Sequence, residues 1–124
     1  MKQFLLSFFA ITILTIACNT KKKCAKTNAN VDENMAFIVK FISKGQGIDA
    51  NSLIAFEKSI TQYNKKNKTP LTYTNEKKGR EGESQYLFKY IDNPCLAAYA
   101  SHIKRTFMQK ELVRIKDSVS IKQQ

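Results

Sequence analysis

Residues 71–91 read LTYTNEKKGREGESQYLFKYI, and this stretch indicates a β-hairpin. Residues 71–74 alternate between two faces and include β-branched threonines, and aromatic residues occupy every second position over 86–91, as in strands with two distinct faces. The polar segment 75–84 contains two glycines, which is typical of a long, mobile loop. We therefore predict two antiparallel strands. Because both faces of the second strand carry apolar residues, we expect it to lie between helices or in an interface.

Helical patterns flank this hairpin on both sides. An aspartate precedes each of two segments, 33–43 and 50–64, and can cap a helix there. In the second segment apolar residues recur at three- and four-residue steps, which is the signature of an amphipathic helix: Leu53, Phe56, Ile60 and Tyr63. Pro70 forbids continuation of that helix.

A third helix is predicted after the hairpin. Asp92-Asn93-Pro94 is a typical helix start, and the apolar residues that follow extend the pattern from Cys95 to about Asp117. The predicted order is thus α-α-β-β-α. We expect a small single α+β domain in which the antiparallel hairpin packs on helices.

The composition fits one folded domain and argues against several protein classes. The 124 residues include 21 Lys and Arg against 10 Asp and Glu, which gives a net charge of +11. An apolar fraction of 43% and a charged fraction of 25% argue against a disordered chain and a multi-span membrane protein. The single histidine excludes a two-histidine metal site, and no nucleotide-binding, nucleophile-elbow or metal-ligand motif occurs. We expect no metal and no cofactor.

The first eighteen residues, MKQFLLSFFAITILTIAC, have the pattern of an export signal. A lysine precedes Phe4–Ile16, a segment too short for an ordinary membrane span of about 20 residues. The end of the stretch resembles the lipobox of bacterial lipoproteins, although Thr15 departs from the usual aliphatic residue. The resemblance implies a signal peptide over 1–17 and lipidation of Cys18. The alternatives are an ordinary cleaved signal and an uncleaved anchor.

Two further cysteines remain once Cys18 is assigned to the anchor. Because exported compartments are oxidising, we predict a Cys24–Cys95 disulfide, which would stabilise the domain by about 4 kcal/mol through loop-closure entropy. The alternative is two free thiols. A catalytic pair of Cys95 with His102 is disfavoured because seven residues of helix separate the two side chains by two turns. A solvent-facing role is the simplest one for His102.

Residues 18–30 are polar and basic and read as a tether between the anchor and a domain over 31–124. Three consecutive lysines, Lys21, Lys22 and Lys23, would lie next to the lipid headgroups and be attracted to an anionic membrane. A solubilising spacer is the alternative. In lipoproteins of Bacteroidota, export to the cell surface follows a rule that requires acidic residues at this place. If the source is such a bacterium, the lysines here imply a periplasm-facing protein.

These features predict a location and a class of function. The folded segment keeps 16 basic against 10 acidic side chains, a net charge of +6. We expect a lipid-anchored, periplasm-facing module of the inner or outer membrane of a bacterial envelope. It would act without catalysis, as a binding module for an acidic envelope or toxin protein or for an anionic envelope polymer. An immunity-type inhibitor of an exported toxin is one specific form. Export argues against nucleic acid as a partner.

Two other functions and one candidate surface remain open. A small cell-envelope hydrolase would need a pocket lined by Cys95 or His102 or by converging acids, and a structural accessory subunit would co-purify with an envelope complex. Tyr73, Tyr86 and Tyr90 could form an aromatic binding face on the hairpin. Their alternative role is packing in the core and at its edge.

Overall fold

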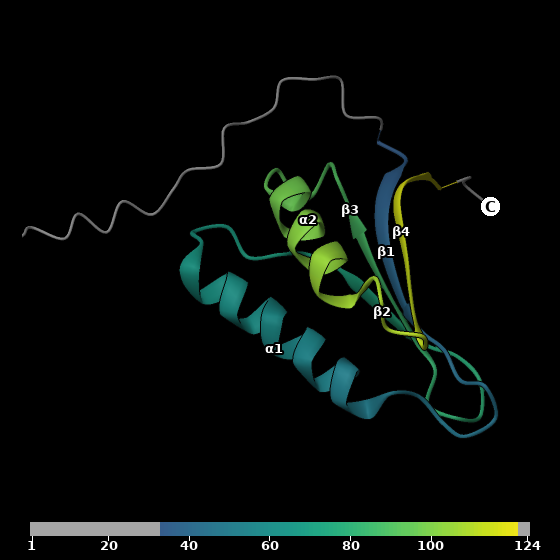
Figure 1. Ribbon diagram of the computed structural model, residues 1–124. Helices are drawn as coiled ribbons and strands as arrows, with labels where there is room; N and C mark the ends of the chain where they lie inside the picture. The colour runs from purple at the N-terminus through teal and green to yellow at the C-terminus, as the bar shows by residue number, and fades with distance from the viewer. Residues whose placement is uncertain (1–32, 122–124) are drawn as a thin grey trace, which may run out of the picture.

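The computed structural model describes residues 33–121, which form a four-stranded antiparallel sheet with two helices on one of its faces (Figure 1). The elements follow the order β1 (Met35–Phe41), α1 (Ala50–Lys66), β2 (Thr74–Lys77), β3 (Ser84–Lys89), α2 (Leu96–Phe107) and β4 (Val113–Ser120). The strands lie in the order β2-β3-β1-β4. Each β-α-β unit therefore encloses a strand of the other unit, which is the split arrangement of ferredoxin-like folds.

The predicted order α-α-β-β-α is wrong, because the observed order is β-α-β-β-α-β. The α+β class and the single small domain are retained. The error concerns two segments: the predicted first helix is the central strand β1, and the predicted last helix ends at Phe107 and is followed by β4.

The error in β1 has a physical cause. Met35–Phe41 is an almost continuous apolar run, MAFIVKF, and four successive residues in it are buried. Ala36 and Ile38, on the face without helices, are 0% and 9% exposed, so the strand loses the alternation that marks a half-exposed strand. Its residues also satisfy a helical spacing. The β-branched and aromatic residues Phe37, Ile38, Val39 and Phe41 are the signal that favours a strand.

The error in β4 arose from extending one apolar stripe too far. Burial alternates with period two over Val113–Ser120, so this segment has strand periodicity and not helix periodicity. The backbone N–H groups of Met108 and Lys110 bond to the carbonyls of Lys104 and Phe107 and close the last turns of α2 before the chain reverses.

The second predicted helix and the hairpin are confirmed. Asp49 caps α1, since its carboxylate accepts hydrogen bonds from the backbone N–H and the hydroxyl of Ser52 at 3.0 and 2.6 Å. β2 and β3 pair antiparallel, with Thr74 opposite Leu87 and Lys77 opposite Ser84. Both strands extend into the segment predicted as a loop, because β2 lies three residues later and β3 two residues earlier than predicted.

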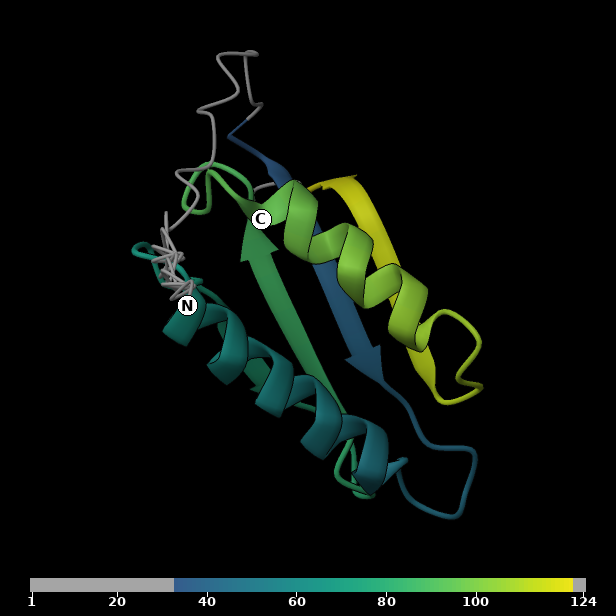
Figure 2. The same ribbon diagram turned by 60° about the vertical axis from the view of Figure 1, so that its left-hand side comes forward.

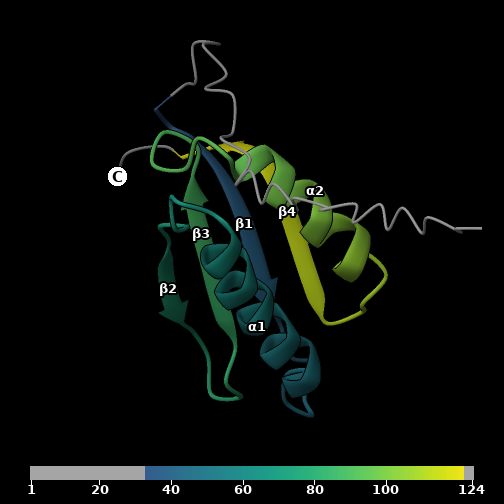
Figure 3. The same ribbon diagram turned by 90° about the vertical axis from the view of Figure 1, so that its left-hand side faces the viewer.

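Aromatic rings fill the space between the helices and the sheet. Phe56 of α1 lies at the centre, with its ring centroid 4.9 Å from that of Tyr86, 5.4 Å from Phe41, 6.1 Å from Phe107 and 6.3 Å from Phe88. The rings meet edge-to-face or tilted, the geometry that aromatic quadrupoles favour. Figure 3 shows both helices in front of the same face of the sheet, so no helix of residues 33–121 covers the opposite face.

Candidate functional site

The open face of the sheet is defined by the alternate residues of each strand. Phe37, Val39 and Phe41 of β1 belong to the core cluster, so Ile38 and Lys40 point to the other face. The register places Leu87 and Lys116 on either side of Ile38. It places Gln85 and Arg114 on either side of Lys40, also on the open face.

Three cations lie together on this face: Lys40, Arg114 and Lys116, which we call the sheet patch. Lys40 is half-buried and stands directly opposite Arg114, while Lys116 follows two residues along the same strand. Directly opposed like charges on one face of a sheet are destabilising. Within residues 33–121 the structure places none of the three in an ion pair. The opposed charges of Lys40 and Arg114 therefore lower the stability of the sheet locally, and nothing in the fold requires them to face each other.

Carboxylates, in contrast, are engaged in contacts within the domain. Seven of the nine acidic side chains in residues 33–121 accept a hydrogen bond or form an ion pair with a neighbouring element or turn: Asp49, Glu57, Glu76, Glu81, Glu83, Glu111 and Asp117. Glu76, on β2, is the acid of the open face, and it pairs with Lys78 at 2.9 Å. The pKa of the Glu111 carboxyl is lowered by its bond to Lys44 and also by the charge of Arg114, which donates to the Glu111 carbonyl at 3.1 Å. Within residues 33–121, however, no carboxylate forms an ion pair with the sheet patch.

A β-bulge shapes the end of β4 beside this patch. The register passes from Ile38 opposite Lys116 to Ala36 opposite Val119, so two residues of β4 face Phe37 alone. Ser118 takes the left-handed conformation there, with φ of 54°. The extra residue puts Val119 on the open face while Asp117 stays on the helix side.

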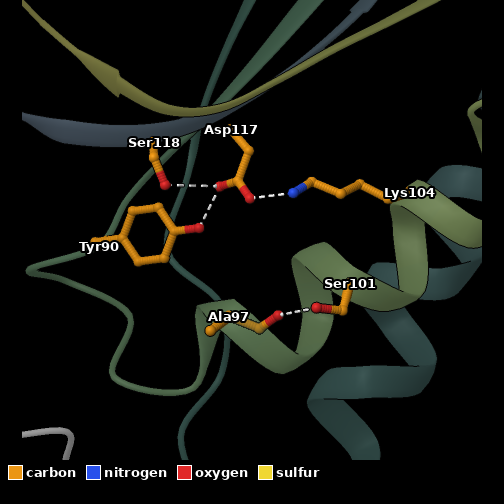
Figure 4. Close-up of polar contacts among 6 residues, drawn as sticks. All are labelled: Tyr90, Ala97, Ser101, Lys104, Asp117 and Ser118. Atoms are coloured by element: carbon orange, nitrogen blue, oxygen red, sulfur yellow. Dashed lines mark hydrogen bonds and ion pairs between the residues drawn. The ribbon is translucent and has the colours of Figure 1, made fainter.

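Asp117 joins three elements through its carboxylate (Figure 4). It accepts hydrogen bonds from the Tyr90 hydroxyl and from the Lys104 ammonium of α2. Partial burial alone would raise the pKa of Asp117, but the bonds from Lys104 and Tyr90 outweigh it and hold the pKa below its usual value. Burial and the adjacent carboxylate raise the pKa of Tyr90, which keeps its proton and donates. This cluster holds the bulge against α2.

The structure brings together only part of the predicted tyrosine face. The ring of Tyr73 lies 5.7 Å from that of Tyr86 and is 40% exposed, but Tyr86 is 2% exposed and donates to Glu57 from within the core. Tyr90 belongs to the Asp117 cluster. Tyr86 and Tyr90 therefore have the alternative role considered above, packing in the core and at its edge. A ligand-binding role for Tyr73 stays a prediction.

His102 lines a groove of about 320 Å³ between α1 and α2. Figure 2 looks onto these two helices, with β1 and β3 behind the space between them. The lining residues are Ser59, Gln62, Tyr63, Lys66, Ala98, Tyr99 and His102, and none is a carboxylate. The Ser59 hydroxyl donates to the Phe56 carbonyl at 2.6 Å, so its proton is directed away from His102. The groove residues show no nucleophile bonded to a base, as hydrolysis requires.

Cys95 lies directly before α2 and is disulfide-bonded, which removes it as a free nucleophile. The predicted partner Cys24 lies outside the described residues, as do Cys18, Lys21, Lys22, Lys23 and the segments 1–17 and 18–30. The predicted pairing, anchor and tether therefore stay predictions. Within residues 33–121, neither helix is long and apolar enough to cross a bilayer, and no group of three His, Cys, Asp or Glu side chains could hold a metal.

Comparisons of the chain with protein-family models, with curated proteins and with solved structures found no match. The candidate site therefore rests on the chemistry of the described residues. Sequence reasoning missed the sheet patch because Lys40, Arg114 and Lys116 fell in segments predicted as helices. The alternation of Arg114 and Lys116 with Val113 and Ile115 is the signal that could have found it.

Proposed function

We propose that this protein is a lipid-anchored module of a bacterial envelope that binds an acidic protein without catalysis, through the open face of its sheet. The observation that carries the proposal is the sheet patch, where two cations stand opposite one another and form no ion pair within residues 33–121. Leu87, which is half-buried, lies beside it and adds apolar contact area, whereas its neighbour Ile38 is only 9% exposed. An apolar centre with a charged rim is the usual anatomy of a protein interface.

An immunity-type inhibitor of an exported toxin is one specific form of this function. An inhibitor has to present a rigid surface of complementary charge, because charge steers association and excludes wrong partners. The sheet patch lies on two paired strands, β1 and β4, and so is held by backbone hydrogen bonds. The lipid anchor on Cys18 would keep the module at the membrane where the partner arrives.

Binding to poly-L-glutamate tests the charge argument with a matched control. The test variant carries Lys40→Gln, Arg114→Gln and Lys116→Gln. The control removes the same charges elsewhere through Lys58→Gln, Arg105→Gln and Lys110→Gln, all at exposed positions. We expect the test variant to bind about ten-fold more weakly than the control at low salt. Equal weakening of both variants would refute a localised binding face.

Cross-linking in the native envelope tests the partner class. A photoreactive residue at Gln85, on the open face, is compared with one at Ser101, on the exposed side of α2. The expected product forms from position 85 only, contains an acidic protein, and is lost in the triple variant. Purified, that protein must bind the lipoprotein in a salt-dependent manner. Products that form equally from both positions, or that contain a neutral or basic partner, contradict the proposal.

A further inference from the structure

One end of the domain gathers the start of β1 and the connections on either side of the hairpin. Asn93 is 3% exposed, and its amide bonds to the backbone of Thr72 at 2.7 and 2.8 Å and to the Lys89 carbonyl at 2.9 Å. The Tyr90 N–H donates to the carbonyl of Met35 at 3.0 Å. These bonds make this end, which we call the anchor end, a rigid platform, visible at the start of β1 and α2 in Figure 1.

The exposed side chains of the anchor end combine cations with an apolar residue. Ile91 is 48% exposed and lines a hollow of about 210 Å³ together with Glu33, Asn34, Lys89 and Ile121. Three further lysines lie at the end of α1: Lys65 and Lys66 in its last turn and Lys68 directly after it. Among the described residues, none of the four lysines forms an ion pair, and two acids, Glu33 and Asp92, accompany them.

Such a surface fits the headgroup region of an anionic bilayer. An aliphatic side chain can enter the boundary between headgroups and acyl chains while lysines beside it contact anionic lipids. The opposite end of the domain differs, because its loops also carry the acids Glu81, Glu83 and Glu111, and part of their charge is held in internal contacts such as Lys44 with Glu111.

The proposed lipid anchor would hold this end close to the membrane. Fourteen residues, 19–32, separate Cys18 from the described domain, and they span at most about 50 Å when extended. With the predicted Cys24–Cys95 disulfide, the free segment shortens to residues 19–23, about 18 Å. Cys95 and the start of β1 lie at the same end, so both attachments draw the anchor end toward the lipid.

We propose that the anchor end docks on the anionic headgroup surface of the bilayer, with Ile91 entering the interface and Lys65, Lys66, Lys68 and Lys89 over anionic lipids. This inference rests on the proposed lipid anchor. Because the strands run away from this end, the open face of the sheet stands upright from the membrane. The sheet patch is then directed sideways, toward a partner in the same compartment.

The absence of tryptophan from the chain permits a direct test. The lipidated full-length protein is prepared as two single variants, Ile91→Trp at the anchor end and Met108→Trp at the opposite end, where Met108 is 74% exposed. Each is reconstituted in vesicles of phosphatidylglycerol and brominated phosphatidylcholine. We expect bromine to quench the Ile91→Trp emission at least about two-fold more than the Met108→Trp emission. In vesicles of brominated phosphatidylcholine alone, that difference should shrink.

Flotation of the same vesicles reports the anchor separately from the docking. If both variants float but are quenched equally, the domain has no fixed orientation and the docking proposal is wrong while the anchor stands. If neither variant floats, the anchor itself is wrong and the docking proposal falls with it. A spectral shift of Ile91→Trp on adding poly-L-glutamate, without quenching by brominated lipid, would identify this end as a protein-binding surface and overturn the lipid assignment.

Discussion

The two faces of the sheet use alternate residues of the same strands for opposite purposes. On β3, Tyr86 and Phe88 enter an aromatic core, whereas Gln85 and Leu87 face away from the helices and are only half-buried. On β4, Val113 is buried in that core, and its neighbour Arg114 is exposed beside Lys40. The helix-covered face thus supplies stability, and the open face is free to carry a charge pattern that stability alone would disfavour.

The largest effect should follow from breaking the covered face. Phe88 is fully buried between Phe37, Phe56 and Tyr99, so Phe88→Ala should lower the free energy of unfolding by about 3–5 kcal/mol. Urea titration followed by circular dichroism measures the change. Its matched control, Leu87→Ala on the opposite face of the same strand, should cost about 1 kcal/mol. Equal costs would mean that the two faces are not energetically distinct.

A smaller effect is expected where the bulge of β4 is held against α2. Asp117→Asn weakens the charge-assisted bonds from Tyr90 and Lys104 and should cost about 1–2 kcal/mol at neutral pH. Because the folded-state pKa of Asp117 is lowered, its contribution is present above the unfolded-state pKa of about 3.9 and is lost as the pH falls through the folded value. Denaturant curves of both proteins between neutral and acid pH should therefore converge. A difference that persists at the acid end contradicts this role.

Backbone strain at the bulge predicts a still smaller change of opposite sign. Ser118 has a φ of 54°, a region that glycine occupies without steric cost. Ser118→Gly should raise the free energy of unfolding by about 0.5 kcal/mol, since relief of strain is partly offset by the greater freedom of glycine in the unfolded chain. Ser118→Val, with a β-branched side chain, should lower it by about 1 kcal/mol. Thermal unfolding of the two variants side by side provides the comparison.

The smallest effect on stability is expected on the open face. Arg114→Gln removes one of two directly opposed cations and should raise the free energy of unfolding by about 0.3 kcal/mol. The same variant should bind poly-L-glutamate more weakly. Stability and binding would then change in opposite directions, which a purely structural role for Arg114 does not predict. Arg114 also donates to the Glu111 carbonyl at 3.1 Å, so a clear loss of stability would show that its contacts with Glu111 outweigh the repulsion from Lys40.

Half of the elements could be predicted from the sequence, and the reasons differ from segment to segment. Helix α1 carries its own cap at Asp49 and a clear amphipathic stripe, and the hairpin strands alternate, so local pattern decides both. The run around Ile38 is ambiguous because burial on both sides removes alternation, and only tertiary contacts show that it is a strand. The hydrophobic stripe of α2 ends without a glycine or proline, so its end was placed too late.

The candidate site could not be predicted because β1 and β4 were both assigned to helices. Lys40 and Arg114 are 74 residues apart in the sequence and become neighbours only through the pairing of β1 with β4, which was not predicted. The basic excess of the chain was visible, but its placement on one face was not. Conversely, the aromatic ring of Tyr86 suggested a binding face, but in the structure this ring packs against Phe56 in the core.

Strand β4 forms one border of the sheet and has a further consequence for a protein held on a membrane. An outermost strand presents unpaired backbone groups that invite edge-to-edge association with other copies, and confinement to a surface raises the frequency of encounters. Here the bulge at Ser118 interrupts the flat hydrogen-bonding edge, and Arg114 and Lys116 add mutual repulsion between copies. The features that disturb this strand locally therefore also protect the protein against self-aggregation.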